Sequence, residues 1–258
     1  MTVHFVGAGP GAADLLTVRA ARLLAAAGVV LYPGTYLDPG VLAHASPDAS
    51  LIDTQGLDLD QITGHLVAAH RAGRETVRLA SGDLSVYSAL SEQTRRLDEA
   101  GVPWDVTPGV PAYAAAAAIV GRELTVPLLA QSVVLTRAQA RSTAMPPTES
   151  LAAFAATRAT LVLHLAVTRT RALMAQIEPH YGPDCPVVVV YRASQPGELV
   201  LRGTVATIAG AVEQAALRQA AVILVGRALD PRPGGESFLY DKARDRLYDK
   251  ARDRKMKG

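Results

Sequence analysis

Short apolar runs alternate with longer amphipathic segments along residues 1–230. An apolar run between turn residues is typical of a buried strand, and apolar residues at helical spacing are typical of a helix. The runs predict strands at residues 3–6, 29–32, 51–52, 76–80, 104–107, 132–136, 160–165, 187–191, 199–203 and 221–225. The amphipathic segments predict helices at residues 13–27, 58–72, 84–100, 111–120, 149–156, 168–177 and 205–217. Strands that alternate with helices in this way predict an α/β fold.

The apolar runs also predict how the sheets are covered and how the chain divides. Residues 187–190 are four valines without polar alternation, which predicts a sheet covered on both faces. A break at Pro108-Gly109 separates two halves of similar length. We therefore expect two α/β domains, at residues 1–109 and 110–230, with a ligand-binding cleft between them.

Residues 231–258 form a tail in this interpretation. The octamer Leu239–Arg246 is repeated without change at Leu247–Arg254. Residues 239–258 hold eight of the 26 Lys and Arg and four of the 24 Asp and Glu, so the rest of the chain carries 18 basic and 20 acidic residues. The net charge of +2 therefore comes from the tail, and we expect no nucleic-acid binding.

Composition bears on where the protein acts. The chain has 258 residues, of which 49% are hydrophobic, so a disordered or fibrous protein is excluded. The single cysteine, Cys185, begins an apolar run, which predicts plain burial in a reducing compartment. The longest apolar stretch, Ala112–Val120, is shorter than the roughly 20 residues that span a bilayer. The start of the chain lacks the pattern of a signal peptide, and we expect a soluble cytoplasmic protein without membrane contact.

Three segments that join a strand to a helix carry the candidate chemistry. The first, Gly7–Ala12, matches G-x-G-x-x-A, the dinucleotide-binding fingerprint. That fingerprint also needs an acidic residue near the end of the second strand, which here ends at Tyr32-Pro33. In addition, Pro10 has no N–H group to donate to a phosphate. A nicotinamide cofactor and a purely structural tight turn are both alternatives for this segment.

The other two segments are Ser81–Tyr87 and Val106–Tyr113. Gly82 would let the backbone approach a ligand closely. Asp83 is interpreted either as a ligand contact or as the N-cap of the helix that follows. The small residues after Pro108 suit either tight packing or an adenosine that lies against the start of the next helix.

In this order and at this spacing, the three segments resemble the tetrapyrrole (corrin and siroheme) methyltransferase family. The matching motifs are Gly7–Gly11 with Leu15-Leu16-Thr17, Ser81-Gly82-Asp83, Pro108-Gly109-Val110, Gln131–Thr136 and Ala221–Gly226. The resemblance extends over about residues 3–241. It implies a two-domain α/β fold with the cofactor in the cleft, S-adenosylmethionine as methyl donor, S-adenosylhomocysteine as product, and a homodimer.

Within the family, the chain most resembles the branch that methylates ring carbon 11 of precorrin-4 in corrin (cobalamin) biosynthesis. The matching segments are Leu31–Thr35, Tyr113 with the five alanines that follow it, Tyr191–Pro196 and Ser237–Asp241. Leu84 departs from the proline that this branch usually has after Gly-Asp. One alternative is methylation at another tetrapyrrole carbon, with cobalt-precorrin and uroporphyrinogen among the substrates. A non-catalytic nucleotide-binding module is another.

The resemblance also implies a set of cofactor contacts. Pro10 would line the floor of the cleft, and the loop Ser81-Gly82-Asp83 would meet the methionine end, with Val86 packed nearby. Pro111 and Ala112 would approach the nucleoside. The adenine would be enclosed from the second domain by Leu165, Tyr191, Arg192, Ala193 and Ala220.

Methyl transfer from a sulfonium to an electron-rich carbon depends mainly on positioning, so we assign no catalytic acid or base. The six histidines lack the spacing of metal ligands, and we expect no protein-bound metal. A tetrapyrrole carries several carboxylates, whereas residues 1–238 are slightly acidic, so local basic residues must hold the substrate. The candidates are Arg122, Arg137, Arg141 and His164, for which solvated surface charges are the alternative interpretation.

Overall fold

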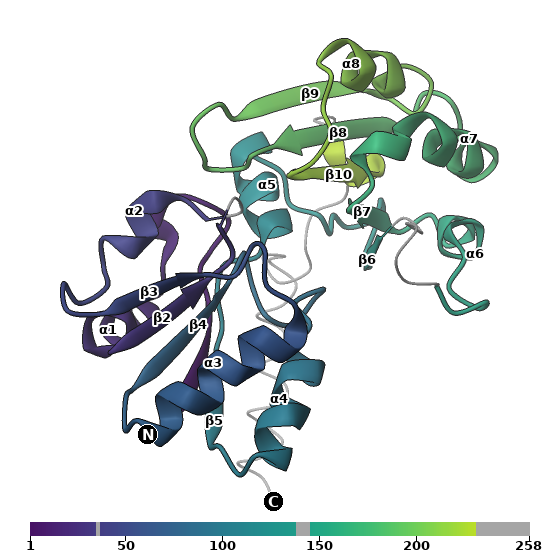
Figure 1. Ribbon diagram of the computed structural model, residues 1–258. Helices are drawn as coiled ribbons and strands as arrows, with labels where there is room; N and C mark the ends of the chain where they lie inside the picture. The colour runs from purple at the N-terminus through teal and green to yellow at the C-terminus, as the bar shows by residue number, and fades with distance from the viewer. Residues whose placement is uncertain (35–36, 138–144, 231–258) are drawn as a thin grey trace, which may run out of the picture. The chain divides into compact units, whose positions relative to one another are not determined.

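The computed structural model describes residues 1–34, 37–137 and 145–230 (Figure 1). The candidate Arg141 and the repeated octamer lie outside these described residues. The chain divides into two compact units, of which the first comprises Met1–Val120, Val190–Val200 and Gln219–Val222, and the second comprises the rest. Within the described ranges, none of the helices has the length and apolar character needed to cross a membrane.

A five-stranded parallel sheet forms the centre of the first unit. Its strand order is β3-β2-β4-β1-β5, and every neighbouring pair runs parallel. The strands are β1 (Val3–Gly7), β2 (Val29–Tyr32), β3 (Ser50–Asp53), β4 (Thr76–Ala80) and β5 (Trp104–Thr107). Because parallel strands end at the same edge, the neighbours β4, β1 and β5 deliver all three candidate segments to one edge of the sheet.

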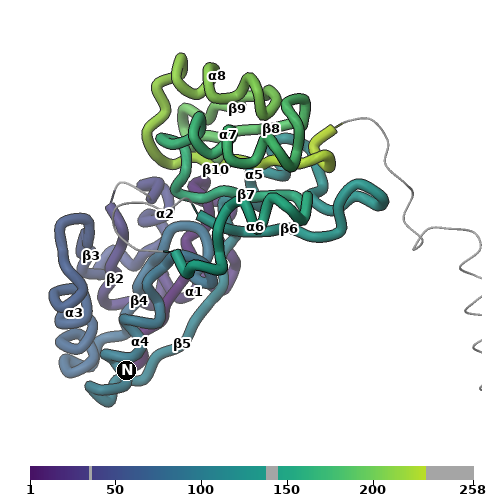
Figure 2. Tube along the Cα trace, turned by 90° about the vertical axis from the view of Figure 1, so that its right-hand side faces the viewer, coloured from purple at the N-terminus to yellow at the C-terminus, as the bar shows by residue number. Residues whose placement is uncertain are grey.

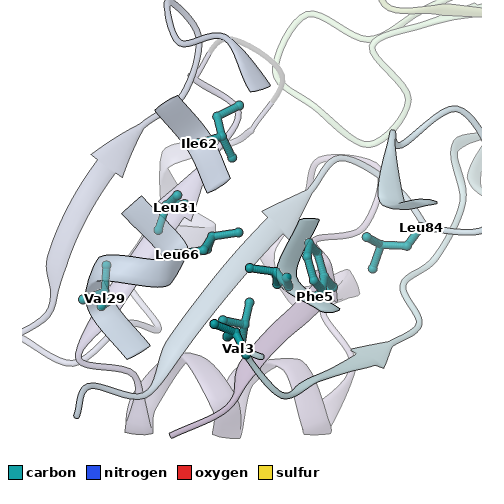
Figure 3. Close-up of a cluster of buried hydrophobic side chains, with 10 residues drawn as sticks. Val3, Phe5, Val29, Leu31, Ile62, Leu66 and Leu84 are labelled. Carbon is teal, nitrogen blue, oxygen red and sulfur yellow. The ribbon is translucent and has the colours of Figure 1, made fainter. Parts of the chain in front are cut away.

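Helices cover both faces of this sheet. On one face, α3 (Leu59–Arg71) and α4 (Leu90–Glu99) lie side by side (Figure 2). They enclose an apolar cluster around Phe5 and Leu31 (Figure 3). On the other face, α1 (Val18–Ala26) and α2 (Pro39–Leu42) cover a second cluster around Val30 and Leu79. Adjacent residues of one strand therefore face different helix layers, as in a parallel sheet that is buried on both sides. Helix α5 (Ala112–Val120) follows β5.

The second sheet has the order β6-β7-β10-β8-β9 and mixed strand directions, since β7 is parallel to β6 and antiparallel to β10. Its strands are β6 (Val133–Arg137), β7 (Thr160–His164), β8 (Pro186–Tyr191), β9 (Leu199–Thr204) and β10 (Ala221–Val225). Helix α7 (Thr170–Tyr181) packs against both α6 (Leu151–Ala156) and α8 (Ile208–Gln214) (Figure 1). Residues 187–190 are fully buried, β9 is an edge strand, and the predicted α/β fold is confirmed.

Helices α1 and α4 show the largest shifts from their predicted starts, at residues 13 and 84. Helix α1 starts at Val18 because the Thr17 side chain caps it by accepting the Ala20 N–H at 3.1 Å. Helix α4 starts only at Leu90, because Tyr87 and Ala89 adopt left-handed backbone angles, with φ of 55° and 54°. The interpretation of Asp83 as the N-cap of this helix is therefore wrong.

The domain boundary expected at residues 109 and 110 stays a prediction. The compact units group the residues in another way, since the first unit continues through α5 to Val120. It also includes Val190–Val200 and Gln219–Val222 from the carboxyl-terminal half. Segments that are far apart in the sequence therefore belong to the same unit as Gly7–Ala12, which we call the glycine-rich turn.

Candidate functional site

Three glycines pack backbone against backbone at the carboxyl ends of β4, β1 and β5. A Cβ atom on Gly109 would lie 2.8 Å from Gly7 Cα, and one on Gly7 would lie 2.8 Å from Gly82 O. Side chains do not approach backbone so closely, so Gly7 and Gly109 are needed for packing. Gly82 differs, because a Cβ there would have 3.7 Å to its nearest atom, Ala112 N, although its φ of +70° disfavours other residues. Gly82 is buried, and a Cβ there would make only ordinary van der Waals contacts.

Backbone hydrogen bonds join the first two candidate segments beyond the end of the sheet. The Gly9 N–H donates to Gly82 O at 3.1 Å, and the Gly82 N–H donates to Gly9 O at 2.7 Å. The Ala8 N–H donates to Ala80 O at 2.8 Å, so the ladder continues directly from β1 and β4. The position of Gly82 is therefore fixed by the glycine-rich turn.

The Asp83 carboxylate ties the second segment to the third. Its Oδ2 accepts the Gly109 N–H at 2.9 Å, and its Oδ1 accepts the Ser85 N–H at 2.8 Å and the Ser85 hydroxyl. Partial burial raises the pKa of Asp83, but the bonds from the Ser85 hydroxyl, Gly109 N–H and Ser85 N–H outweigh it and lower the pKa below its ordinary value. Asp83 is therefore an ionised group that holds two loops together.

The carboxyl-terminal segment Tyr191–Ala193 belongs to the same unit as these loops. The Arg192 N–H donates to Ala220 O at 2.8 Å, and both residues have left-handed backbone, with φ of 48° and 52°. Left-handed non-glycine residues are uncommon and gather at functional sites. The first unit thus contains every predicted cofactor-binding residue except Leu165: Pro10, Ser81, Gly82, Asp83, Val86, Pro111, Ala112, Tyr191, Arg192, Ala193 and Ala220.

Leu165 lies in the second unit, directly after β7. Its side chain is 68% exposed, and its φ is 52°. An exposed leucine in a strained backbone conformation is compatible with a ligand contact.

Two of the predicted substrate-binding residues are neighbours at the carboxyl ends of parallel strands. Arg137 on β6 is in register with His164 on β7, so the two side chains leave the sheet on the same face. Burial lowers the pKa of His164, which makes its imidazole neutral at pH 7. The guanidinium of Arg122, the other described candidate, donates to Leu229 O at 3.3 Å and to Gly121 O at 2.9 Å.

A family model for tetrapyrrole (corrin/porphyrin) methylases matches residues 2–209 of this chain. The chain belongs to the tetrapyrrole methylase family. The resemblance predicted from the motifs is thereby confirmed.

Similar proteins cover nearly the whole chain. A precorrin-4 C(11)-methyltransferase of Rhodococcus erythropolis is 50% identical over 246 residues, which are 95% of this chain and 99% of that protein. The solved structure of a cobalt-precorrin-4 methyltransferase matches with a TM-score of 0.86 at 38% identity, covering 89% of this chain and 96% of that one. A uroporphyrin-III C-methyltransferase from Thermus thermophilus, solved with S-adenosylhomocysteine, matches with a TM-score of 0.75 at 31% identity, covering 89% and 99%.

The thiol and the possible metal ligands of this tetrapyrrole methylase also bear on its chemistry. Cys185 is only 3% exposed, and burial raises the pKa of its thiol to about 11, so the predicted burial is confirmed. Across the described residues, no three His, Cys, Asp or Glu side chains are grouped so that they could hold a metal ion.

Sequence reasoning missed Ser194 and Gln195, which contact the glycine-rich turn. The Ala12 N–H donates to Ser194 Oγ at 3.1 Å, and Gln195 Nε2 donates to Pro10 O at 2.7 Å. The only signal in the sequence was their place in the Tyr191–Pro196 motif.

Proposed function

We propose that this tetrapyrrole methylase transfers a methyl group from S-adenosylmethionine to ring carbon 11 of precorrin-4, a step of cobalamin biosynthesis. The full-length similarity to the Rhodococcus enzyme of that name supports the reaction. The structural observation that carries the proposal is the meeting of Gly7, Gly82 and Gly109 at the carboxyl ends of adjacent parallel strands. Ligands of open α/β sheets bind outside this edge.

The residues at this edge fit the methyl donor. A Cβ atom on Gly82 would lie 3.8 Å from Pro111 Cα and 3.7 Å from Ala112 N, so a side chain there would fill the space beside these two residues. Ser81, Gly82 and Asp83 would hold the methionine end, with Val86 and Pro10 nearby. Pro111 and Ala112 would meet the nucleoside. The adenine contacts would be Tyr191, Arg192, Ala193, Ala220 and Leu165.

When bound, S-adenosylmethionine supplies an electrophilic methyl group on a sulfonium. The residues of this chain would orient the donor and the acceptor carbon in line, which is the main requirement of such a transfer. Asp83 is ionised, and its oxygens accept N–H and O–H groups of the protein. It would therefore keep the loops in place rather than move a proton.

Arg137 and His164 would bind carboxylates of the tetrapyrrole. Their register on β6 and β7 gives one cation and one neutral donor on a common face. Arg122, whose guanidinium donates to the backbone carbonyls of Gly121 and Leu229, would be a further contact for these carboxylates. The homodimer and the cytoplasmic location stay predictions, which light scattering and cell fractionation would test.

The deciding experiment is turnover with alternative substrates. The purified protein is incubated with S-adenosylmethionine and, separately, precorrin-4, cobalt-precorrin-4 and uroporphyrinogen III, and the product is analysed by mass and by the position of the new methyl group. One methyl group at carbon 11 is the expected result. A methyl group at another carbon would support the alternative regiochemistry, and cofactor binding without any turnover would support a nucleotide-binding module.

Gly82→Val tests whether this loop binds the cofactor. A branched side chain in the left-handed conformation would occupy the space beside Ala112, so calorimetry should detect no S-adenosylhomocysteine binding. Gly56→Val is the matched control, because Gly56 is exposed and has no atom within 4 Å of a Cβ position. Equal affinity in a folded Gly82→Val protein would remove the loop from the site.

A further inference from the structure

Residues 194 and 195 are fastened to a turn that lies more than 180 positions earlier in the chain. Gln195 Nε2 donates to Pro10 O at 2.7 Å, and the Ala12 N–H donates to Ser194 Oγ at 3.1 Å. The two bonds flank Gly11, so both ends of the turn are held. We call this pair of bonds the 194–195 clasp.

The packing around Gly11 fits the clasp. A Cβ atom on Gly11 would lie 2.9 Å from Gln195 Cδ and still closer to its Cγ, so the glutamine side chain occupies the space that any other residue at position 11 would need. Gly11 is buried, and the Gln195 side chain is half-buried. Glycine at this position is therefore explained by contact with Gln195 rather than by a left-handed backbone angle.

Hydrogen bonds among residues 192–198 also orient the side chains of the clasp. Gln195 Oε1 accepts Arg192 Nε–H at 3.4 Å, which directs the amide nitrogen of Gln195 toward Pro10 O. The Gln195 N–H donates to Arg192 O at 2.9 Å, and the Ser194 N–H donates to Glu198 Oε2 at 2.7 Å. Arg192 and Ser194 are both left-handed, with φ of 48° and 62°. A segment with two strained residues needs such contacts to keep one conformation.

We propose that Gln195 and Ser194 are positioning residues for the cofactor. They would hold Tyr191–Ala193 in the conformation that binds the nucleoside and would hold Pro10 in the turn beneath it. The inference rests on the proposed function and deepens it. The Gln195 amide nitrogen donates to Pro10 O, and the Ser194 hydroxyl oxygen accepts the Ala12 N–H. Because both groups bond to the turn, the two side chains act on the cofactor through the residues they hold.

The proposal predicts a specific kinetic result for Gln195→Glu. The two side chains have the same shape, but a carboxylate oxygen would face Pro10 O and repel it. We expect the Kd for S-adenosylhomocysteine and the KM for S-adenosylmethionine to rise about tenfold, the size expected when a partly buried carbonyl loses its donor. The kcat at saturating donor should stay within about twofold, because the clasp does not touch the reacting atoms. A merely structural role would lower the urea midpoint without this split between KM and kcat.

Gln131→Glu is the matched control for the change of charge and shape. Gln131 is exposed, and its Nε2 also donates to a backbone carbonyl, that of Ala130. We expect no change in the Kd for S-adenosylhomocysteine in this variant.

Gly11→Ala opens the clasp without changing residue 195. The new Cβ must displace the Gln195 side chain, so the same rise in Kd is expected. Shortening the glutamine in the double variant Gly11→Ala/Gln195→Ala removes the clash, and its Kd should be no worse than that of Gln195→Ala alone. Additive losses would overturn the proposal.

The outcomes separate this inference from the proposed function. If the unchanged protein fails to bind S-adenosylhomocysteine, both are rejected. If the unchanged protein binds it and the folded variants Gln195→Glu and Gly11→Ala bind equally well, only the clasp is rejected.

Discussion

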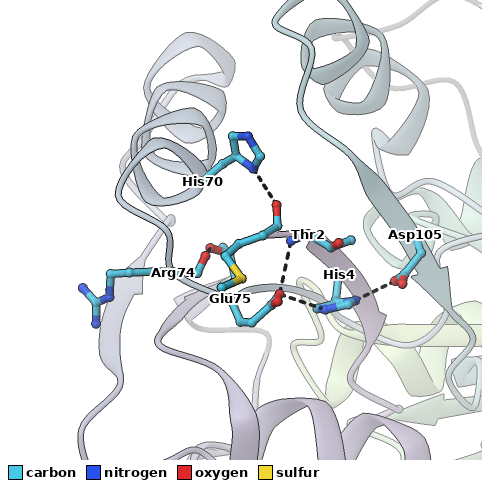
Figure 4. A network of polar contacts seen from close by, with 8 residues as sticks. Thr2, His4, His70, Arg74, Glu75 and Asp105 are labelled. Carbon is cyan, nitrogen blue, oxygen red and sulfur yellow. Dashed lines mark hydrogen bonds and ion pairs between the residues drawn. The ribbon is translucent and has the colours of Figure 1, made fainter.

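The two ends of the first sheet use different means to join the same three strands. At the amino ends of β4, β1 and β5, side chains make the connections (Figure 4). His4 Nδ1 lies 2.9 Å from Asp105 Oδ1, His4 Nε2 lies 3.3 Å from Glu75 Oε2, and the Thr2 N–H donates to the same Glu75 oxygen at 3.2 Å. At the carboxyl ends, the backbones of Gly7, Gly82 and Gly109 pack directly on one another.

This difference separates structural from functional requirements. At the amino end, the polar side chains are paired with one another, and these pairs join the three strands. At the carboxyl end, the glycines let the three backbones pack directly on one another, at the edge where ligands of open α/β sheets bind. We therefore expect changes at the carboxyl end to affect binding, whereas changes at the amino end should affect stability alone.

The largest effect is expected from Gly109→Ala. The added Cβ would lie 2.8 Å from Gly7 Cα and closer still to Gly82 O, and backbone atoms cannot move aside as a flexible side chain can. We expect a loss of about 3 kcal/mol or more in the free energy of unfolding, above the usual cost of overpacking, and at least a hundredfold weaker binding of S-adenosylhomocysteine. Urea denaturation and calorimetry measure the two quantities.

Gly64→Ala is the control for that substitution. Gly64 lies within α3, and a Cβ there would have no atom within 4 Å. This variant should gain about 0.5–1 kcal/mol of stability, because alanine favours the helix. Similar losses in the two variants would contradict the account of the carboxyl end.

The second prediction extends the comparison to the second sheet, where Arg137 and His164 also stand at the carboxyl ends of parallel strands. Arg137→Ala should weaken precorrin binding about tenfold, since one charge-assisted hydrogen bond is lost. The Kd for S-adenosylhomocysteine should change by less than twofold. Titration of each ligand measures the two affinities, and a parallel loss of both would mean that Arg137 is structural.

The strands could be predicted from the sequence because a buried strand consists of apolar residues. Residues 187–190 are apolar on both faces, and the structure buries all of them. The start of α4 could not be predicted in the same way. Asp83 and Ser88 bond to nearby groups of the chain and compete with the helix, while Tyr87 and Ala89 are residue types that give no signal of a left-handed backbone.

The part of the candidate site that contains glycines could be predicted from the sequence. Gly82 is required by its φ of +70°, and Gly109 is required by the close approach of the Gly7 and Gly82 backbones. The role of Gln195 could not be predicted from its residue type, since it depends on Pro10 and Gly11, which lie next to it only in the folded chain. The left-handed angles of Leu165, Arg192 and Ala220 are also products of tertiary structure.

The third prediction concerns the amino end. His4→Ala removes the contacts with Glu75 and Asp105, whose side chains are 39% and 55% exposed, so each contact is worth little. We expect the free energy of unfolding to fall by about 1 kcal/mol and the Kd for S-adenosylhomocysteine to stay the same. The exposed His44→Ala serves as the control. Weaker cofactor binding in His4→Ala would break the separation between the two ends.

Asp83→Asn should give the smallest effect and the clearest pH dependence. Asp83 links the loops by accepting the Gly109 and Ser85 N–H groups, and an amide would turn one donor toward another. We expect about threefold weaker S-adenosylhomocysteine binding and a loss of less than about 1 kcal/mol in stability at pH 7, because Asp83 is only partly buried.

The direction of the pH effect follows from the lowered pKa of Asp83 in the folded state. A carboxyl group of this kind stabilises the fold above its unfolded pKa of about 3.9, and the stabilisation is lost as the pH falls through the folded-state pKa. The difference in unfolding free energy between the unchanged protein and Asp83→Asn should therefore be greatest at pH 7 and shrink as the pH falls below about 4. Urea denaturation at several pH values measures this difference. If it stays constant over that range, the Asp83 carboxylate does not hold the loops through its charge, and the carboxyl end is joined by its glycines alone.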